Sequence, residues 1–436
     1  MRQRHEDVSF SGLTLPAAES GEEGDPGRSW RQHSGTGVSP VQRKSWQSFG
    51  RSYTGETPVP LDLPCILHPT ERYWGNPPAK RSTWTFQPQI VVDIRLPMRF
   101  PFSLTRSVTG YLLRKKLAGE KRFPLVLMLE PLHACNLLCA GCGRIREYAD
   151  TIHSRLSIDR CLAALEECGA PIVSVCGGEP LIYPGIEELV ARILAQRKHV
   201  YVCTNGLLLE RKLHGLPRSD RLLINVHLDG MEATHDRAAG REGVFDAATA
   251  GIRAAKAAGL RVCTNTTVYK QTDLHEIAVL FEYLTQLGVE GLMISPAFGY
   301  SAVQRADPEG AQQIFMTRQE VHEKFRLARR LLGRFKLTAS PVYMDFLCGG
   351  RELPCAAWAN PTYNVRGWRG PCYLMADAHY PSYRELVETT DWGRLGPAGD
   401  PRCRDCLVHC GFEPAAVLSA NKRFGDVFRM AVWQMT

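Results

Sequence analysis

The sequence predicts an α/β fold, a partial (β/α)6 barrel followed by a cysteine-rich and mostly irregular C-terminal extension. Two observations lead to this fold class. From residue 123 onward, short apolar runs alternate with amphipathic stretches, which is the pattern of parallel βαβ units, and six such units fit a partial barrel. After about residue 340 this alternation is lost, while cysteines become frequent.

Each barrel element has its own signal in the sequence. The expected strands cover residues 124–130, 171–176, 199–203, 222–228, 261–268 and 291–295. The expected helices cover 157–168, 185–197, 243–259, 273–287 and 312–336, with a shorter one near 206–214. Ser157 suits the N-cap of the first helix, and Gly169 its end. The charged run 234–237 is expected to form a loop over the barrel mouth.

Composition excludes several function classes. The chain has 436 residues, of which 44% are hydrophobic, so a large core is possible. A net charge of +8 is too small to indicate a nucleic-acid partner. No secretory leader is recognisable, and no apolar run is long enough to span a membrane. We therefore expect a cytoplasmic protein, at most peripheral on the inner face of the cytoplasmic membrane, whose cysteines bind metal or react.

The first 97 residues differ from the rest. They are rich in Ser, Gly, Pro and Arg and lack periodicity, so they cannot bury enough apolar surface to offset ordering. A regulatory tail, a disordered segment without a role and a gene-model artefact with the true start at Met98 are the three interpretations. We favour the last.

Residues 98–122 form a basic amphipathic segment. Its apolar residues Val108, Tyr111, Leu112 and Leu117 recur at helical spacing. The basic residues near its end are Arg114, Lys115, Lys116, Lys121 and Arg122. Such a helix can lie in a membrane interface, or it can cap the open end of the barrel, and both interpretations stay open.

Three cysteines follow the first strand. Cys135, Cys139 and Cys142 have the spacing C-x3-C-x2-C. Three thiolates can hold a four-iron cluster and leave one iron open for a chelating ligand. The alternative is a zinc knuckle, for which His133 or His153 would supply the fourth ligand.

The second strand ends in the run Cys176, Gly177, Gly178, Glu179, Pro180. Consecutive glycines let the backbone approach a ligand closely, although Gly-Gly by itself is also a common tight turn. The third strand ends in Thr-Asn-Gly, which contains Asn205.

Together, these motifs at successive strand ends resemble the radical S-adenosylmethionine (SAM) superfamily. The resemblance implies a 4Fe–4S cluster on the three cysteines and SAM chelated to its open iron. It also implies that Gly177, Gly178, Glu179 and Pro180 contact the methionine part of SAM, and that Asn205 lies beneath SAM.

Polar residues continue along the later strands. Asn225, His227 and Asp229 alternate, so they share one face, which for a barrel strand is the lumen. We expect His227 and Asp229 to bind SAM, the alternatives being a satisfied core histidine and a turn-capping aspartate. Asn265 and Ser295, near the ends of the fifth and sixth strands, are further candidates for SAM contacts.

The tail holds a second cysteine motif. Cys403, Cys406 and Cys410 have the spacing C-x2-C-x3-C, and Cys372 or Cys355 could be a fourth ligand. The motif suits a second metal centre, either an auxiliary iron–sulfur cluster or zinc. Thiols without any ligand are the third interpretation.

Residues 98–436 as a whole resemble the hopanoid-biosynthesis family of radical SAM proteins, which lacks the first 97 residues. The stretches that carry this resemblance are 124–131, 135–143, 176–180, 226–230, 360–368, 370–373, 390–392 and 403–413. It implies that the deoxyadenosyl radical adds to the double bond of diploptene, giving adenosylhopane. SAM is then a co-substrate, and flavodoxin or ferredoxin is the expected reductant.

The carbon radical left by such an addition must be quenched by a hydrogen atom. We expect Cys176 to donate it, because a strand end beside SAM places its thiol near the substrate; the alternative is a small buried residue that fills space. Cys203 and Cys263 hold related positions on neighbouring strands. Two other functions stay open, a radical SAM enzyme that matures a peptide or cofactor with an auxiliary cluster, and a zinc-stapled binding module.

Overall fold

The computed structural model describes residues 98–419 and 423–436. The three interpretations of the first 97 residues therefore lie outside the described part of the chain. Within it, the six expected strands are all present, parallel and in chain order from one neighbour to the next. The strands are β1 (Val126–Leu129), β2 (Ile172–Val175), β3 (His199–Thr204), β4 (Leu222–His227), β5 (Arg261–Val268) and β6 (Gly291–Pro296).

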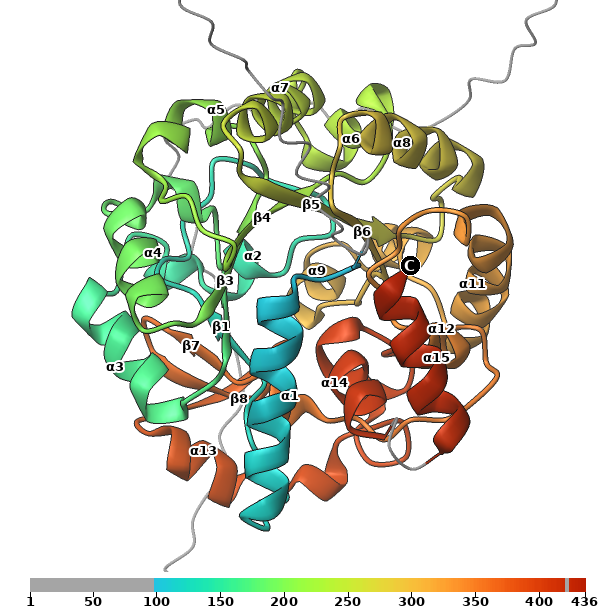
Figure 1. The fold of residues 1–436 in the computed structure, drawn as a ribbon. Helices are drawn as coiled ribbons and strands as arrows, with labels where there is room; N and C mark the ends of the chain where they lie inside the picture. The colour runs from blue at the N-terminus through green and yellow to red at the C-terminus, as the bar shows by residue number, and fades with distance from the viewer. Residues whose placement is uncertain (1–97, 420–422) are drawn as a thin grey trace, which may run out of the picture. The chain divides into compact units, whose positions relative to one another are not determined.

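Helices line the outer face of this curved sheet, as Figure 1 shows for α3, α4, α7 and α8. The helices up to the end of the barrel are α1 (Phe102–Leu117), α2 (Arg144–Glu147), α3 (Ile158–Cys168), α4 (Ile186–Ala195), α5 (Leu209–Lys212), α6 (Glu232–Ala239), α7 (Val244–Ala257) and α8 (Leu274–Gln286). The Ser157 side chain accepts a hydrogen bond from Arg160 N, and Gly169 ends α3 in a left-handed conformation. Both predicted signals are confirmed.

The charged run 234–237 is helical, so the prediction of a loop was wrong. It lies within α6, which Gly240 ends with a left-handed conformation. Glu276 of α8 stabilises the start, because its carboxylate accepts from Met231 N and from the Thr234 hydroxyl. This tertiary contact is not visible in the local sequence.

The single helix expected over 312–336 is two helices. They are α10 (Pro308–Ile314) and α11 (Arg318–Leu332), preceded by the short α9 (Ser301–Ala306). The break is at Thr317, whose side chain accepts from Glu320 N while the Glu320 carboxylate accepts from Thr317 N. This capping box begins a new helix.

The C-terminal region is more ordered than the sequence predicted. Its elements are α12 (Pro341–Leu347), β7 (Thr362–Asn364), β8 (Gly367–Cys372), β9 (Met375–Tyr380), α13 (Tyr383–Thr389), α14 (His409–Ser419) and α15 (Phe424–Met435). Strand β7 pairs in parallel with β1, and β8 and β9 follow as antiparallel neighbours, so the sheet order is β6-β5-β4-β3-β2-β1-β7-β8-β9. The late segment thus extends the barrel sheet beside the first strand.

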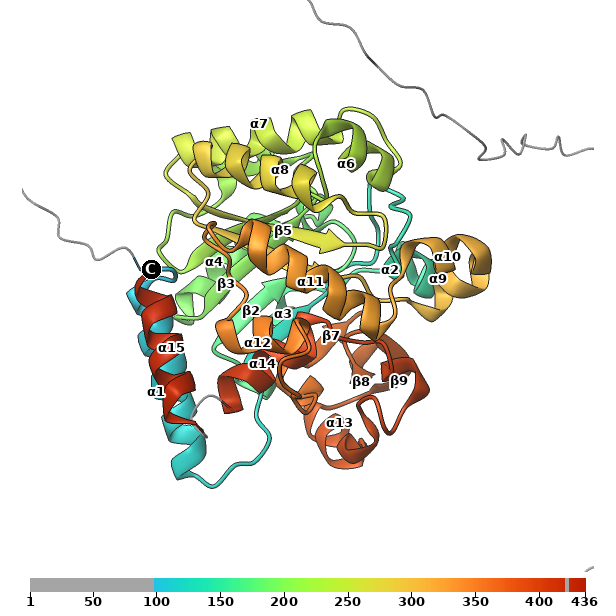
Figure 2. The same ribbon diagram turned by 90° about the vertical axis from the view of Figure 1, so that its right-hand side faces the viewer.

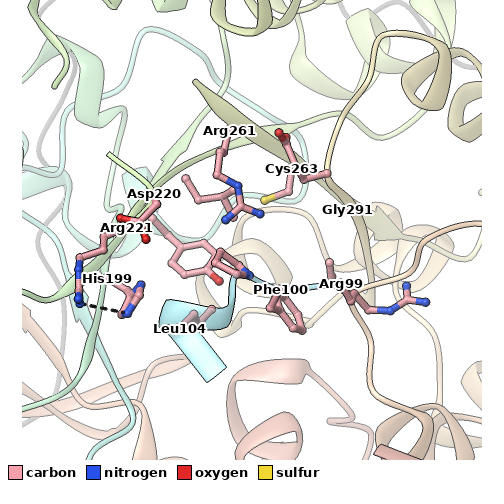
Figure 3. A pocket seen from close by; sticks show the side chains of 14 residues that line it. Arg99, Phe100, Leu104, His199, Asp220, Arg221, Arg261, Cys263 and Gly291 are labelled. Carbon is pink, nitrogen blue, oxygen red and sulfur yellow. Dashed lines mark hydrogen bonds between the residues drawn. The ribbon is translucent and has the colours of Figure 1, made fainter. Parts of the chain in front are cut away.

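The start of α1 closes the base of the barrel, where the strands begin. Figure 3 shows Arg99, Phe100 and Leu104 facing His199 and Arg261 around a cavity of about 20 Å³, room for roughly one water molecule. The capping interpretation of residues 98–122 therefore fits the structure, and the membrane interpretation is left open. No helix in residues 98–419 and 423–436 is long and apolar enough to cross a membrane.

Candidate active site

The three motif cysteines lie in the loop between β1 and α2, at the edge of the sheet where the parallel strands end. Their thiols are half-buried, and Cys142 lies close enough to the other two to raise the pKa of Cys135 and of Cys139. Burial raises the pKa of Cys135 to about 11 and that of Cys139 to about 12. A cationic metal cluster would supply the charge that holds these thiols as thiolates, so the donor set fits the 4Fe–4S cluster that the motif predicts.

A zinc knuckle fits the loop less well. The His133 ring is buried, stacks on Tyr148 at 3.9 Å between centroids, and its Nδ1 lies 3.1 Å from the Thr151 hydroxyl. His153 is exposed. Within residues 98–419 and 423–436, no group of three or more His, Cys, Asp or Glu side chains is arranged to hold a single metal ion.

The double glycine packs against the segment that leads into the cysteine loop. Gly178 N donates to Leu132 O, and Glu179 N donates to Ala134 O. A Cβ on Gly178 would lie 1.8 Å from the Ala134 carbonyl oxygen, and one on Gly177, whose φ is +107°, would lie 2.5 Å from Leu132 O. Only glycine allows such a close approach. Both glycines therefore fix the position of the cysteine loop through backbone contacts. Their contact with SAM stays a prediction.

Glu179 ties the second and third strand ends together. Its buried carboxylate accepts from Leu181 N at 3.0 Å, from the Thr204 hydroxyl at 2.7 Å and from Asn205 N at 2.8 Å. The Asn205 amide in turn donates to Asn136 in the cysteine loop at 2.8 Å. Pro180 begins the short 3₁₀ helix Pro180–Ile182. The predicted motifs therefore converge, and three donors already occupy the carboxylate assigned to SAM.

A buried ion pair anchors the far end of the cysteine loop. Arg144 directly follows the Cys-Gly end of the motif, and its Nε lies 2.8 Å from the Glu130 carboxylate at the end of β1. Arg144 also donates to Tyr373 O at 2.7 Å and pairs with Glu147 at 3.2 Å. Its guanidinium stacks over the Tyr373 ring at 4.3 Å. Glu130 and Arg144 are both buried. If either side chain were removed, water could not solvate the charge that remained.

The lumen-facing polar residues form one connected set. His227 Nε2 lies 2.8 Å from Asp229 Oδ2, and His227 Nδ1 lies 3.2 Å from the Asn265 amide. Asp229 Oδ1 also accepts from Thr267 N. Burial lowers the pKa of His227, but the Asp229 carboxylate outweighs it and raises that pKa above its usual value. The alternation read from the sequence places these side chains together as predicted.

A row of thiols lies deeper in the same lumen. The Cys203 Sγ is 3.3 Å from the Ser174 hydroxyl and 3.6 Å from the Asn225 amide nitrogen, and the Cys263 thiol donates to Asn225 Oδ1 at 3.3 Å. Cys203 is half-buried and Cys263 is buried. Cys263 also lines the cavity at the base of the barrel.

Cys176 and Ser295 both meet the C-terminal region. The buried Cys176 thiol hydrogen-bonds with the Tyr373 hydroxyl, and burial raises the pKa of this thiol well above its usual value. The Ser295 hydroxyl lies 3.1 Å from Nδ1 of His409. The Ser295 hydroxyl therefore already has a partner in the C-terminal region, and its contact with SAM stays a prediction.

Five cysteines of the C-terminal region, the tail cysteines, lie close together: Cys355, Cys372, Cys403, Cys406 and Cys410. The first four each raise the pKa of at least one other member of the set, and three of them raise the pKa of Cys410. A Cβ on Gly411 would lie 2.7 Å from the Cys355 Sγ, so the chain is packed closely here. Cys348 is separate, because its thiol donates to Phe325 O at 3.3 Å. The structure brings both suggested fourth ligands to the C-x2-C-x3-C motif.

Two family models match the chain. The model described as the radical SAM superfamily covers residues 129–284, which hold the cysteine loop and the converging strand ends. Residues 129–284 belong to the radical SAM superfamily. A second model, a domain of unknown function named DUF3463, covers residues 292–430. Radical SAM membership implies a 4Fe–4S cluster and SAM, and the tail cysteines lie within the DUF3463 domain.

The radical SAM domain is similar to parts of several curated proteins. A GTP 3′,8-cyclase from Mycolicibacterium smegmatis is 33% identical over 199 residues, which are 43% of this chain and 55% of the relative. An Fe-coproporphyrin III synthase from Methanosarcina barkeri is 29% identical over 35% of this chain and 39% of its own length. The chain therefore spans about half, or less, of the length of these relatives.

Two further proteins are similar over a longer stretch. A PqqA peptide cyclase from Gluconobacter oxydans is 26% identical over 62% of this chain and 76% of its own length. The crystal structure of Streptococcus suis SuiB bound to its precursor peptide SuiA superposes with a TM-score of 0.50. It covers 69% of this chain and 74% of SuiB at 13% identity, so it shows the fold alone.

Sequence reasoning missed three residues of this site. Glu130, Arg144 and Tyr373 hold the radical SAM domain to the DUF3463 domain, and none was assigned a role. The available signals were a charged residue at the end of an apolar strand and an arginine two positions after the last cysteine of the motif. Their pairing depends on tertiary structure.

We expect Arg144→Gln to lower the free energy of unfolding by about 3–5 kcal/mol, because it leaves the Glu130 carboxylate buried and unpaired. Guanidinium unfolding of the full chain measures this change. Arg192→Gln is the matched control, since Arg192 and its partner Asp159 are exposed, and it should cost less than about 1 kcal/mol. Equal effects of the two variants would contradict the anchoring role of Arg144.

Proposed function

We propose that this chain is a radical SAM enzyme that joins the 5′-deoxyadenosyl group of SAM to the exocyclic double bond of diploptene, the reaction of an adenosylhopane synthase. The observation that carries the proposal is the set of thiols in the lumen. An addition to an alkene leaves a carbon radical that must gain one hydrogen atom. Cys176, Cys203 and Cys263 place S–H groups at or below the strand ends where SAM is expected.

The three motif cysteines would hold the cluster, which would pass one electron from flavodoxin or ferredoxin to SAM, so that the sulfur–carbon bond breaks and methionine is released. The deoxyadenosyl carbon forms a bond to the terminal alkene carbon, and the π bond breaks. A thiol donates a hydrogen atom to the remaining carbon radical, and flavodoxin or ferredoxin returns one electron, with a proton, to the thiyl left behind.

The chain's own residues would position the reactants. Glu179 and Asn205 hold the third strand end beside the cysteine loop. The His227–Asp229 pair presents a polar group at the mouth for the sugar or amino acid part of SAM. Tyr300 and Tyr373 cover Arg144, which keeps water away from this side of the loop.

A second candidate function is the maturation of a peptide or cofactor. The comparisons favour it over the first, because the curated relatives include a GTP cyclase and a peptide cyclase. The five tail cysteines also support it, since an auxiliary cluster could accept the electron that a substrate radical loses when it is oxidised to product. The two candidates differ in the direction of electron flow, because addition consumes a hydrogen atom whereas oxidative maturation releases an electron.

Incubation of the reconstituted full chain with SAM, reductant and diploptene should give a product whose mass equals diploptene plus deoxyadenosine. Mass spectrometry of the lipid extract detects it. A Cys135→Ala, Cys139→Ala, Cys142→Ala variant should give none, because it cannot hold the cluster. Deoxyadenosine without a hopanoid adduct would move the assignment to the second candidate.

We propose that Cys403, Cys406 and Cys410, with Cys372 or Cys355, hold a second iron–sulfur cluster. The reconstituted chain should then carry about eight irons, four for each cluster. Replacing Cys403, Cys406 and Cys410 together by alanine should leave about four, as measured by iron and sulfide analysis. Cys348→Ala is the control and should change nothing. About four irons in the unaltered chain would refute a second cluster.

We keep Cys176 as the predicted hydrogen donor. Cys176→Ser should then divert most of the product away from adenosylhopane, because serine holds its hydrogen too strongly to quench the radical. Product analysis by mass spectrometry measures the yield. Cys203→Ser is the comparison variant, since Cys203 is more exposed to the lumen than Cys176. An unchanged yield from Cys176→Ser would exclude this role, and a loss only in Cys203→Ser would assign it to Cys203.

A further inference from the structure

Helix α15 presents an apolar face to solvent. Phe424, Val427, Phe428, Val432 and Met435 are exposed and recur at spacings of three and four residues, so they form one stripe along the helix. Phe424 is 88% exposed and Phe428 is 64% exposed. A surface helix of a globular protein normally turns such a stripe toward the core. The orientation of α15 therefore needs an explanation.

Specific contacts fix the rotation of α15 about its axis. Asp426 is buried and makes two hydrogen bonds with Arg351, at 2.9 and 3.0 Å. At the other end, the Gln434 amide donates to Thr105 Oγ1 at 2.8 Å, and the Trp433 ring packs edge-on against Phe100. Asp426, Met430, Trp433 and Gln434 face the protein, so the apolar stripe is held outward.

Helix α1 adds to the same face. It lies on the same side of the molecule as α15, at the left of the fold in Figure 2, and its start meets the end of α15 through Thr105 and Gln434. It exposes Phe102, Leu113 and Leu117. We define the α1–α15 face by the exposed side chains Phe102, Leu113, Leu117, Phe424, Val427, Phe428, Val432 and Met435. These are eight of the ten large hydrophobic side chains that are exposed in the described part of the chain. Such a concentration marks an interaction surface.

The charge around this face is positive. The exposed basic residues on or next to the two helices are Arg106, Arg114, Lys116, Lys121, Arg122, Arg423 and Arg429. Helix α1 contains no acidic residue, and Asp426, the one acid of α15, is buried against Arg351. Glu120, just after α1, is paired with Lys115 at 2.8 Å. Two copies of this face would bring like charges together, which disfavours self-association.

We propose that the α1–α15 face docks on the surface of an anionic lipid bilayer, with both helices lying in the interface. The apolar stripe enters the headgroup boundary, and the basic residues contact anionic headgroups. Docking turns the base of the barrel toward the bilayer, because the start of α1 closes that base (Figure 3). The proposal rests on this face alone and not on the proposed substrate.

Vesicle flotation of the full chain tests the proposal without SAM or any substrate. Vesicles that carry roughly a third of anionic phospholipid should bind the chain at least about tenfold more strongly than neutral ones, and added salt should weaken the binding. Phe424→Ser with Phe428→Ser should reduce binding at least about tenfold. Val279→Ser is the control, because Val279 is an exposed apolar residue of α8 outside the face.

Light scattering of the same variants separates the alternatives. The proposal expects the Phe424→Ser, Phe428→Ser variant to keep the molar mass and circular dichroism of the unaltered chain while it loses vesicle binding. Absence of binding to anionic vesicles, or equal binding by both variants, would overturn the proposal. A fall in molar mass without any vesicle binding would make the face a contact between copies of this chain and would overturn it too.

Discussion

The ion pair between Glu130 and Arg144 is the interaction on which the site depends. Glu130 ends the first strand and Arg144 follows the third cysteine, so the pair closes the cysteine loop at its two ends. Between these ends, the loop accepts hydrogen bonds from Glu179 N at Ala134 O and from the Asn205 amide at Asn136. Because Arg144 also reaches Tyr373 O, the same side chain ties the loop to the C-terminal domain.

Burial of this pair is tolerated because the surrounding charges compensate one another. Glu147 lies between Arg144 and Arg369, at 3.2 and 3.0 Å, so two carboxylates face two guanidinium groups in one buried network. Arg369 is itself held by Met375 O at 2.8 Å. A buried network of this kind adds little net stability, but it penalises any other placement of the loop. The network therefore specifies where the iron ligands lie more than it strengthens the fold.

The barrel could be predicted from the sequence because its signals are local. Each strand is a short apolar run with polar residues at its end, and the alternation of Asn225, His227 and Asp229 alone places them on one face. Contacts between distant segments could not be predicted in this way. The pairing of β7 with β1 and the approach of Cys355 to the C-x2-C-x3-C motif join residues separated by tens to hundreds of positions. Helix α6 escaped prediction for the same reason, because Glu276 stabilises its first turn.

The two candidate reactions require different chemistry from two groups of cysteines that lie close together, the lumen thiols and the tail cysteines. Tyr373 contacts both Cys176 and Arg144. It also directly follows Cys372, one of the five tail cysteines. A reaction that consumes a hydrogen atom would use the lumen thiols and would leave the tail cysteines a structural role. A reaction that releases an electron would use the tail cysteines and would need the lumen thiols to stay unreactive. Burial raises the pKa of Cys176 and Cys203, which keeps both as thiols, the form that donates a hydrogen atom. This property suits the consuming reaction, in which a thiol must give up a hydrogen atom.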